Sequence, residues 1–212
     1  MYQKHPSKKL NELFQEKSFQ GVSPEKAKFL FVGLDANYAE NIESQNIFGK
    51  IIEYHSDGVS FWQKYKVHHP FLLDGYKGDG KKYHRNFSRL GFQEKDANLI
   101  SFIELLNFPT VGRNKELSIT DLSTSHLSLI NDCIVNNNAK YIFVSSGVAN
   151  LMRKSRQFSW LPEKPKELFR NLRIFWQSQN KTVFSHLHFS NYGKFEEQML
   201  LEAQTIKELI EN

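Results

Sequence analysis

The stretch Ala27-Lys28-Phe29-Leu30-Phe31-Val32-Gly33-Leu34 decides the fold of this chain. It is a short, nearly continuous apolar run that ends at Gly33-Leu34, which is typical of a β-strand buried on both faces. A strand of this kind belongs to a sheet with helices on both sides. We therefore expect residues 27–34 to form the central strand of a mainly parallel sheet.

Apolar runs and helical spacings alternate along the rest of the chain, which predicts parallel strands joined by helices. The further predicted strands are residues 99–106, 140–146, 173–177 and 182–189, and the last two are placed to form a hairpin. The predicted helices are residues 7–19, 42–56, 61–66, 82–90, 124–136, 148–153 and 194–211. We expect one α/β domain over residues 1–212, with three layers and a central sheet of four to five strands.

Composition limits the classes of function. With 40% hydrophobic and 24% charged residues the chain is of ordinary globular type, and its net charge of +5 favours polyanionic partners. The single Cys133 rules out a four-cysteine zinc site and a cysteine-held iron–sulfur cluster. No run reaches the roughly eighteen apolar residues of a membrane span. We expect a cytoplasmic protein that contacts no membrane and works as a monomer.

Polar residues follow the predicted strands, at the edge where open α/β sheets bind ligands. Gly33-Leu34-Asp35-Ala36-Asn37-Tyr38 offers a glycine for close approach and a carboxylate, although an aspartate here also serves as a helix cap or turn former. Asn107 offers an amide that can read a base edge, or simply a turn before Pro109. His186 and His188 lie on one face if their strand continues that far, and one histidine near Asp35 would complete an acid/base pair.

A metal site is an alternative interpretation of the histidines. His186 and His188, with His68-His69 and Asp35, are residue types that bind zinc. No acidic third ligand has a clear spacing, so we expect neither a metal nor any other cofactor.

The ordered set of motifs resembles the uracil-DNA glycosylase superfamily over most of the chain. The resemblance is carried by Gly33-Leu34-Asp35 with Tyr38, by Leu105-Leu106-Asn107, by Phe143-Val144-Ser145-Ser146-Gly147 and by His188-Phe189-Ser190. The family's Asp-Pro-Tyr reads Asp35-Ala36-Asn37-Tyr38, with one extra residue. Both prolines of its His-Pro-Ser-Pro are missing, and so are the cysteines of its iron–sulfur branches.

The resemblance implies a hydrolase of base excision repair that flips a base out of DNA, single- or double-stranded, and cuts its N-glycosidic bond. Asp35 would then position the water and stabilise the sugar cation, and His188, or alternatively His186, would stabilise the leaving base. Gly33, Leu34, Tyr38 and Asn107 would line the base site, and Phe71 is our prediction for the stacking ring. Arg113, Ser190, Asn191, Tyr192 and Lys194 would contact DNA, with residues 81–85 as further phosphate contacts.

Two other functions stay open at this point. A nucleic-acid or nucleotide-binding protein could keep the fold without the reaction, in which case Asp35 is structural. A metal-dependent hydrolase would use the histidines instead, and a chelator would silence it.

Overall fold

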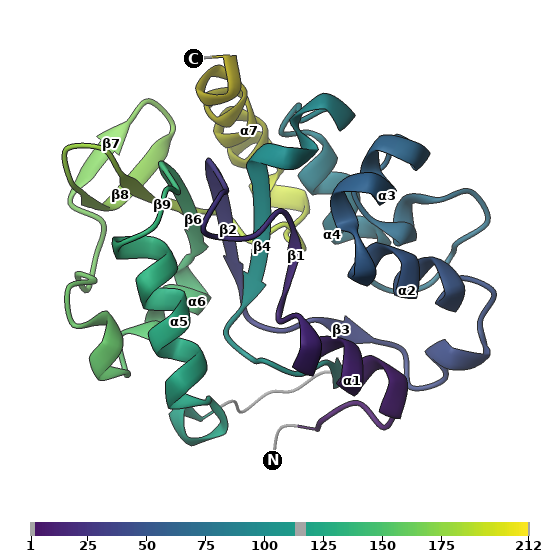
Figure 1. Cartoon of the computed structure of the whole chain (residues 1–212). Coiled ribbons are helices and arrows are strands. Elements are labelled where there is room, and N and C mark those ends of the chain that lie inside the picture. Colours follow the sequence, from purple (N-terminus) through teal and green to yellow (C-terminus); the bar gives the residue numbers. More distant parts are fainter. Residues whose placement is uncertain (1–2, 113–117, 212) are drawn as a thin grey trace.

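Strand β2 (Phe29–Gly33) lies in the middle of a seven-stranded sheet, as the apolar run at residues 27–34 predicts. The computed structural model describes residues 3–112 and 118–211. Strand order is β1-β4-β2-β6-β9-β8-β7, and the pairs β4–β2, β2–β6 and β6–β9 are parallel. The expectation of a mainly parallel central sheet flanked by helices is confirmed (Figure 1).

The elements have the following bounds. The strands of the large sheet are β1 (Phe19–Gly21), β2 (Phe29–Gly33), β4 (Ile100–Glu104), β6 (Tyr141–Ser145), β7 (Glu167–Phe169), β8 (Leu172–Gln177) and β9 (Thr182–His186). A separate parallel pair joins β3 (Asn37–Tyr38) and β5 (Thr110–Val111). The α-helices are α1 (Lys8–Glu16), α2 (Phe48–Ser56), α3 (Gly58–Tyr65), α4 (Lys81–Ser88), α5 (Thr124–Val135), α6 (Ser146–Met152) and α7 (Glu196–Glu211). Short 3₁₀ turns are η1 (Ile42–Ser44), η2 (Pro70–Leu72), η3 (Glu94–Leu99), η4 (Ile119–Asp121), η5 (Arg156–Phe158) and η6 (Gly193–Phe195).

The sheet is larger than the four to five strands expected. The predicted hairpin is present, since β8 and β9 pair antiparallel, but β1 and β7 extend the two edges. Each of these edge strands has only three residues, and Gly21 in β1 adopts a positive φ of 81°. Strands this short form because they pair with β4 and β8, and no local sequence pattern predicts them.

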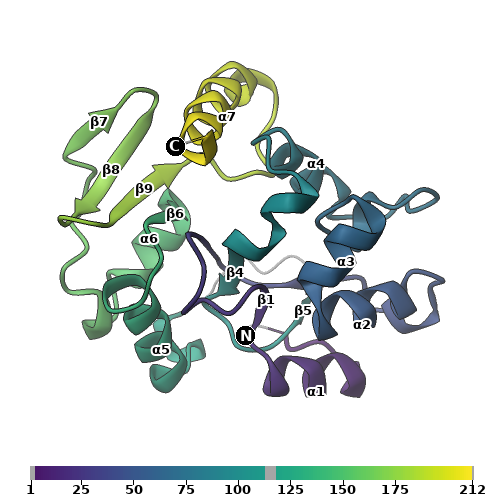
Figure 2. The ribbon, with the colours of Figure 1, turned by 45° about the horizontal axis from the view of Figure 1, so that its top comes forward.

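Two apolar layers cover the sheet. On one face β2, β4, β6 and β9 pack against α5 and α6, and on the other they pack against α3, α4 and α7. A third cluster joins α1 and α2 to β3 and to the turn η2 beside the sheet, and Figure 2 shows these helices grouped away from α5 and α6. Among the described residues, none of the helices combines the length and apolarity needed to cross a bilayer.

A row of four phenylalanines crosses the parallel strands on the α4 side. Phe102, Phe31, Phe143 and Phe184 are register partners on β4, β2, β6 and β9. The rings stack in sequence, with centroids 5.6, 4.7 and 5.5 Å apart. Offset stacking adds to the burial of each ring, so this row holds four strands in one register.

Removing a ring from this row is expected to destabilise the whole sheet. Phe143 is fully buried between two stacked neighbours. Phe143→Ala should therefore lower the free energy of unfolding by about 3–5 kcal/mol, measured by urea denaturation. Leu168→Ala, at a side chain 67% exposed on β7, is the control and should change it by less than about 0.5 kcal/mol. Equal effects of the two variants would contradict this account.

Candidate functional site

A polar row lies two residues beyond the phenylalanine row, towards the carboxyl ends of the strands. Because side chains alternate along a strand, the residues that follow the four phenylalanines on the same face are Glu104, Gly33, Ser145 and His186. Gly33 pairs with Glu104, and Ser145 pairs with His186. From this row the chain runs on to Asp35 after β2 and to His188 after β9, so both lie at the edge predicted to bind ligands.

Asp35 is half-buried and held by two neighbours from the β3–β5 pair. Its Oδ2 accepts a short hydrogen bond from the Thr110 hydroxyl and a longer one of 3.4 Å from the Asn37 amide. The same amide donates to Thr110 Oγ1 at 3.0 Å and to the Gly112 carbonyl at 2.7 Å. Within the described residues the Asp35 carboxylate caps no helix. Both hydrogen bonds reach Oδ2, and among the described residues the other carboxylate oxygen accepts none.

His188 presents one defined ring nitrogen. The backbone N–H of Ser190 donates to His188 Nδ1 at 3.2 Å, and Ser190 Oγ lies 2.6 Å from the same atom. A nitrogen that accepts from a backbone amide carries no proton, so the neutral ring has its proton on Nε2. The His188 side chain is exposed, but the protein packed beside it still lowers the pKa of the ring, and the charge of Asp35 opposes this effect. The ring is therefore a neutral N–H donor within the electrostatic reach of Asp35.

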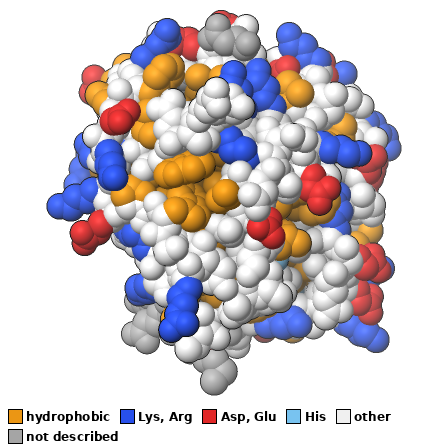
Figure 3. Space-filling view, turned by 60° about the vertical axis from the view of Figure 1, so that its left-hand side comes forward, with side chains coloured by type: hydrophobic (Ala, Val, Ile, Leu, Met, Phe, Trp, Pro, Cys, Tyr) orange, Lys and Arg blue, Asp and Glu red, His pale blue; other side chains and the backbone are white. Residues whose placement is uncertain are grey.

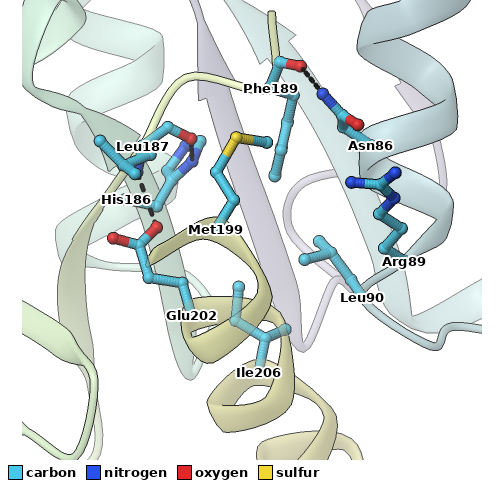
Figure 4. Close-up of a pocket in the computed structure, with 9 residues that line it drawn as sticks. All are labelled: Asn86, Arg89, Leu90, His186, Leu187, Phe189, Met199, Glu202 and Ile206. Atoms are coloured by element: carbon cyan, nitrogen blue, oxygen red, sulfur yellow. Dashed lines mark hydrogen bonds between the residues drawn. The ribbon is translucent and has the colours of Figure 1, made fainter. Parts of the chain in front are cut away.

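Helix α4 braces the turn that carries His188. The buried Asn86 amide donates to the Phe189 carbonyl at 2.6 Å (Figure 4) and to the Asn191 carbonyl at 3.4 Å. One turn earlier, the Tyr83 ring lies 5.4 Å from His188 and 5.4 Å from Phe189. Both ends of the turn are thus fixed to one helix.

Helix α7 holds the start of the same segment. The Leu187 N–H donates to Glu202 Oε2 at 2.8 Å, and the Leu187 carbonyl accepts from His186 Nδ1 at 2.7 Å (Figure 4). His186 is buried and lines the small pocket beneath α7, with its ring 4.7 Å from Phe189. Strand β9 ends at His186, so the alternation that would place both histidines on one face does not reach His188.

The predicted base-site residues are only partly brought together. Gly33 and Leu34 lie at the end of β2 beside Asp35, and Asn107 is half-buried, with no side-chain hydrogen bond among the described residues. Tyr38 is 5% exposed, and its hydroxyl bonds His55 Nε2 at 3.0 Å. Phe71 is 3% exposed and stacks on Tyr76 at 4.3 Å, so the structure does not present it as an open stacking surface.

The predicted DNA contacts follow His188 in one short segment. Ser190 and Lys194 are exposed, Asn191 is half-buried, and Tyr192 is 70% exposed with the Lys82 ammonium 3.7 Å from its ring centroid. Arg113 lies outside the described residues. In the predicted phosphate-binding run 81–85, His84 is instead turned inward against His69, with ring centroids 3.5 Å apart.

Two residues belong to this edge in positions that the sequence interpretation did not assign to the base site. Glu104 ends β4, and the Tyr83 hydroxyl lies within electrostatic reach of the Glu104 and Asp35 carboxyl groups. The signal for Glu104 was available, because it is the one charged residue in the apolar run 99–106. Tyr83 was included only in the predicted phosphate-binding run 81–85, and no local signal placed it beside His188, because α4 reaches the site only through the tertiary fold.

A cluster of buried imidazoles lies behind the site. His68 Nε2 is 3.2 Å from His84 Nδ1, and His69 stacks on His84. Burial lowers the pKa of all three rings, so they are neutral. In the part of the chain that the structure describes, no three His, Cys, Asp or Glu side chains are arranged to hold a metal ion.

No family model matches this chain, and no curated protein matches it significantly.

Loss of the Asn86 amide should loosen the His188 turn. Asn86→Ala leaves the buried carbonyl of Phe189 without its donor, and we expect the free energy of unfolding to fall by about 1–3 kcal/mol in urea denaturation. Asn136→Ala removes an exposed amide bonded only to exposed Asp132, and should cost less than about 0.5 kcal/mol. An Asn86 variant as stable as the Asn136 variant would contradict the proposal that Asn86 holds the turn after His188 in place.

Acid should destabilise the protein through its neutral histidines. Burial lowers the pKa of His55 and His84 to about 3 and of His186 to about 4, against an ordinary 6.5. The unfolded chain therefore binds more protons below pH 6.5, and stability present above that pH is lost as pH falls towards 3. The free energy of unfolding from urea denaturation at pH 7, 6 and 5 should fall progressively, by on the order of 1 kcal/mol per pH unit for each ring.

His186→Asn provides the control for this acid sensitivity. Its amide can reproduce the Nδ1–H donation to Leu187 but does not titrate, so the loss of stability below pH 6 should become less steep. A midpoint that stays level between pH 7 and pH 5 in the unmodified protein would refute the role of the imidazoles.

Proposed function

We propose that this chain is a divergent member of the uracil-DNA glycosylase superfamily that hydrolyses the N-glycosidic bond of a base flipped out of DNA. The order of its parallel strands supports the proposal. The parallel strands β2, β4, β6 and β9 each end at a segment that carries one of the motifs quoted above. Along the chain these motifs follow the order that the family shows. With no matching relative, the fold alone does not specify the reaction.

One observation carries the proposal: an acceptor and a neutral donor face the same edge from β2 and β9. Cleavage of an N-glycosidic bond builds positive charge on the sugar and negative charge on the base. The Asp35 carboxylate is suited to the sugar, and the Nε2–H of His188 is suited to the base. Both groups are fixed in advance by neighbours, which is what electrostatic stabilisation requires.

In the proposed reaction, Asp35 accepts a hydrogen bond from the attacking water and stabilises the oxocarbenium-like sugar. His188 donates from Nε2 to a carbonyl oxygen of the departing base, and Ser190 keeps the ring in the donating tautomer. Tyr83 provides a half-buried ring beside His188 on which a flipped base can stack, a role we had assigned to Phe71. Asn107 remains the amide proposed to read the base edge.

DNA is proposed to lie across the turn after His188. Tyr192 projects there as an exposed aromatic side chain, with Lys82 and Lys194 close by to neutralise phosphates. An exposed ring of this kind can wedge into the base stack and offset the cost of flipping. On the face towards β7, Figure 3 shows Lys and Arg side chains scattered around hydrophobic patches.

Asp35→Asn should abolish release of the base while leaving DNA affinity equal or higher, because a negative charge near phosphates is removed. His188→Ala should slow release by about a hundredfold or more, since it removes a donor aimed at developing charge. The measurement uses labelled oligonucleotides with uracil, hypoxanthine or a G·T mismatch, incubated in a chelator and cleaved with alkali at abasic sites.

Asp74→Asn is the matched control, because Asp74 is exposed and lies outside the site. It should release the base as fast as the unmodified protein. Binding of DNA with no release from any substrate would instead favour the non-catalytic binding protein, and activity that the chelator abolishes would favour the metal hydrolase.

A further inference from the structure

Glu104 places a second carboxyl group directly beside the Asp35 segment. It ends β4 at the register partner of Gly33 on β2, and its carboxyl covers the Gly33 Cα. A β-carbon built on Gly33 would lie 2.6 Å from Glu104 Cδ, so the glycine provides the space that the carboxyl occupies. Within the described residues this half-buried carboxyl has no hydrogen-bond partner, which leaves it free to act on a ligand.

The surroundings favour the protonated form of Glu104. Burial, and then the negative charge of Asp35, raise the pKa of Glu104 to about 8. The other titratable side chains that act on it are phenols kept neutral by burial, namely Tyr38 of β3, Tyr54 of α2 and Tyr83 of α4. From α5, His126 Nε2 bonds the backbone carbonyl of Glu104 at 2.8 Å, and burial lowers the pKa of that ring. At neutral pH the edge therefore holds the protonated carboxyl group of Glu104 beside Asp35.

We propose that Glu104 is the proton donor to the departing base, a role that rests on the glycosidic hydrolysis proposed above. Many enzymes that cleave glycosidic bonds use two carboxyl groups, of which one is protonated and acts as a general acid while the other is ionised. Glu104 comes from the strand on one side of β2, and His188 follows β9 on the other side, two strands away. A ligand bound over Asp35 would therefore have Glu104 on one side, which can transfer its proton, and His188 on the other, which donates a hydrogen bond without transferring a proton.

The reaction balances without a further reagent. The C1′–N bond breaks with its electron pair going to the base, and the Glu104 proton passes to the base. Water adds to C1′ and gives its proton to Asp35. Glu104 then regains a proton from solvent, and Asp35 releases one. The sum is one water consumed, one neutral base and one abasic sugar formed.

This role defines the class of substrate. A base that is a good leaving group as an anion gains little from a proton donor, whereas a base that leaves poorly as an anion depends on it. We therefore infer that the site acts on bases of the second class, and that removal of the Glu104 proton penalises them selectively.

The test compares leaving groups in single-turnover release from oligonucleotides that carry either uracil or 5-fluorouracil, whose fluorine stabilises the departing anion. Glu104→Gln keeps a donor of similar shape but transfers no proton. It should slow release of uracil by about a hundredfold or more, and release of 5-fluorouracil by less than about tenfold. Glu40→Gln, at an exposed glutamate, is the control and should alter neither rate.

The pH profile provides a second signature. In the unmodified protein, uracil release should fall about tenfold per pH unit above pH 8, while Glu104→Gln should show no such fall. Gly33→Ala, which pushes the carboxyl aside without changing its chemistry, should reproduce the selective loss for uracil.

The outcomes separate this role from the proposed function. Base release that Glu104→Gln leaves unchanged, or slows equally for both leaving groups, overturns the proton-donor role alone. No release of either base by the unmodified protein overturns the proposed function and this role with it. If the variant does not fold, carbon-13 NMR of the unmodified protein decides: a Glu104 carboxyl that titrates near the ordinary 4.5 overturns the role, and one that titrates near 8, and lower in Asp35→Asn, supports it.

Discussion

The stacking of four phenylalanine rings across the parallel strands is the interaction on which the rest of the structure depends. Phe102, Phe31, Phe143 and Phe184 fix the register of β4, β2, β6 and β9, because a one-residue slip would turn every ring to the opposite face. The same register aligns the polar row two residues further on. The order of the core and the geometry of the site are therefore consequences of one set of contacts.

Much of the fold was predictable because its main signals are local. The five predicted strands are all present, and the run at residues 27–34 alone indicated a buried central strand. The site was predictable in outline, since Asp35 and His188 do follow strands that share an edge. A further signal was overlooked: in each parallel strand a phenylalanine is followed two residues later by Gly33, Glu104, Ser145 or His186.

What the sequence could not supply depends on contacts between distant segments. The three-residue strands β1 and β7 exist only through their partners, and Tyr83 reaches His188 because α4 packs beside a turn more than a hundred residues away. Phe71 illustrates the limit of residue type, since its aromatic ring suggested a ligand surface while the structure buries it against Tyr76 and other neighbours. The presence of an aromatic residue in the sequence alone does not distinguish a ring that stacks on a ligand from a ring that packs in the core.

The two shortest strands also govern how this sheet meets other molecules of its kind. An open sheet ends in unpaired backbone groups that invite another chain to add on, and long flat edges are where fibres begin. Here both edges are three residues long, and Lys166 and Arg170 flank β7 with positive charge. The sheet therefore exposes few unpaired backbone groups along its edges, which limits the addition of strands from other copies of the protein even at high protein concentration.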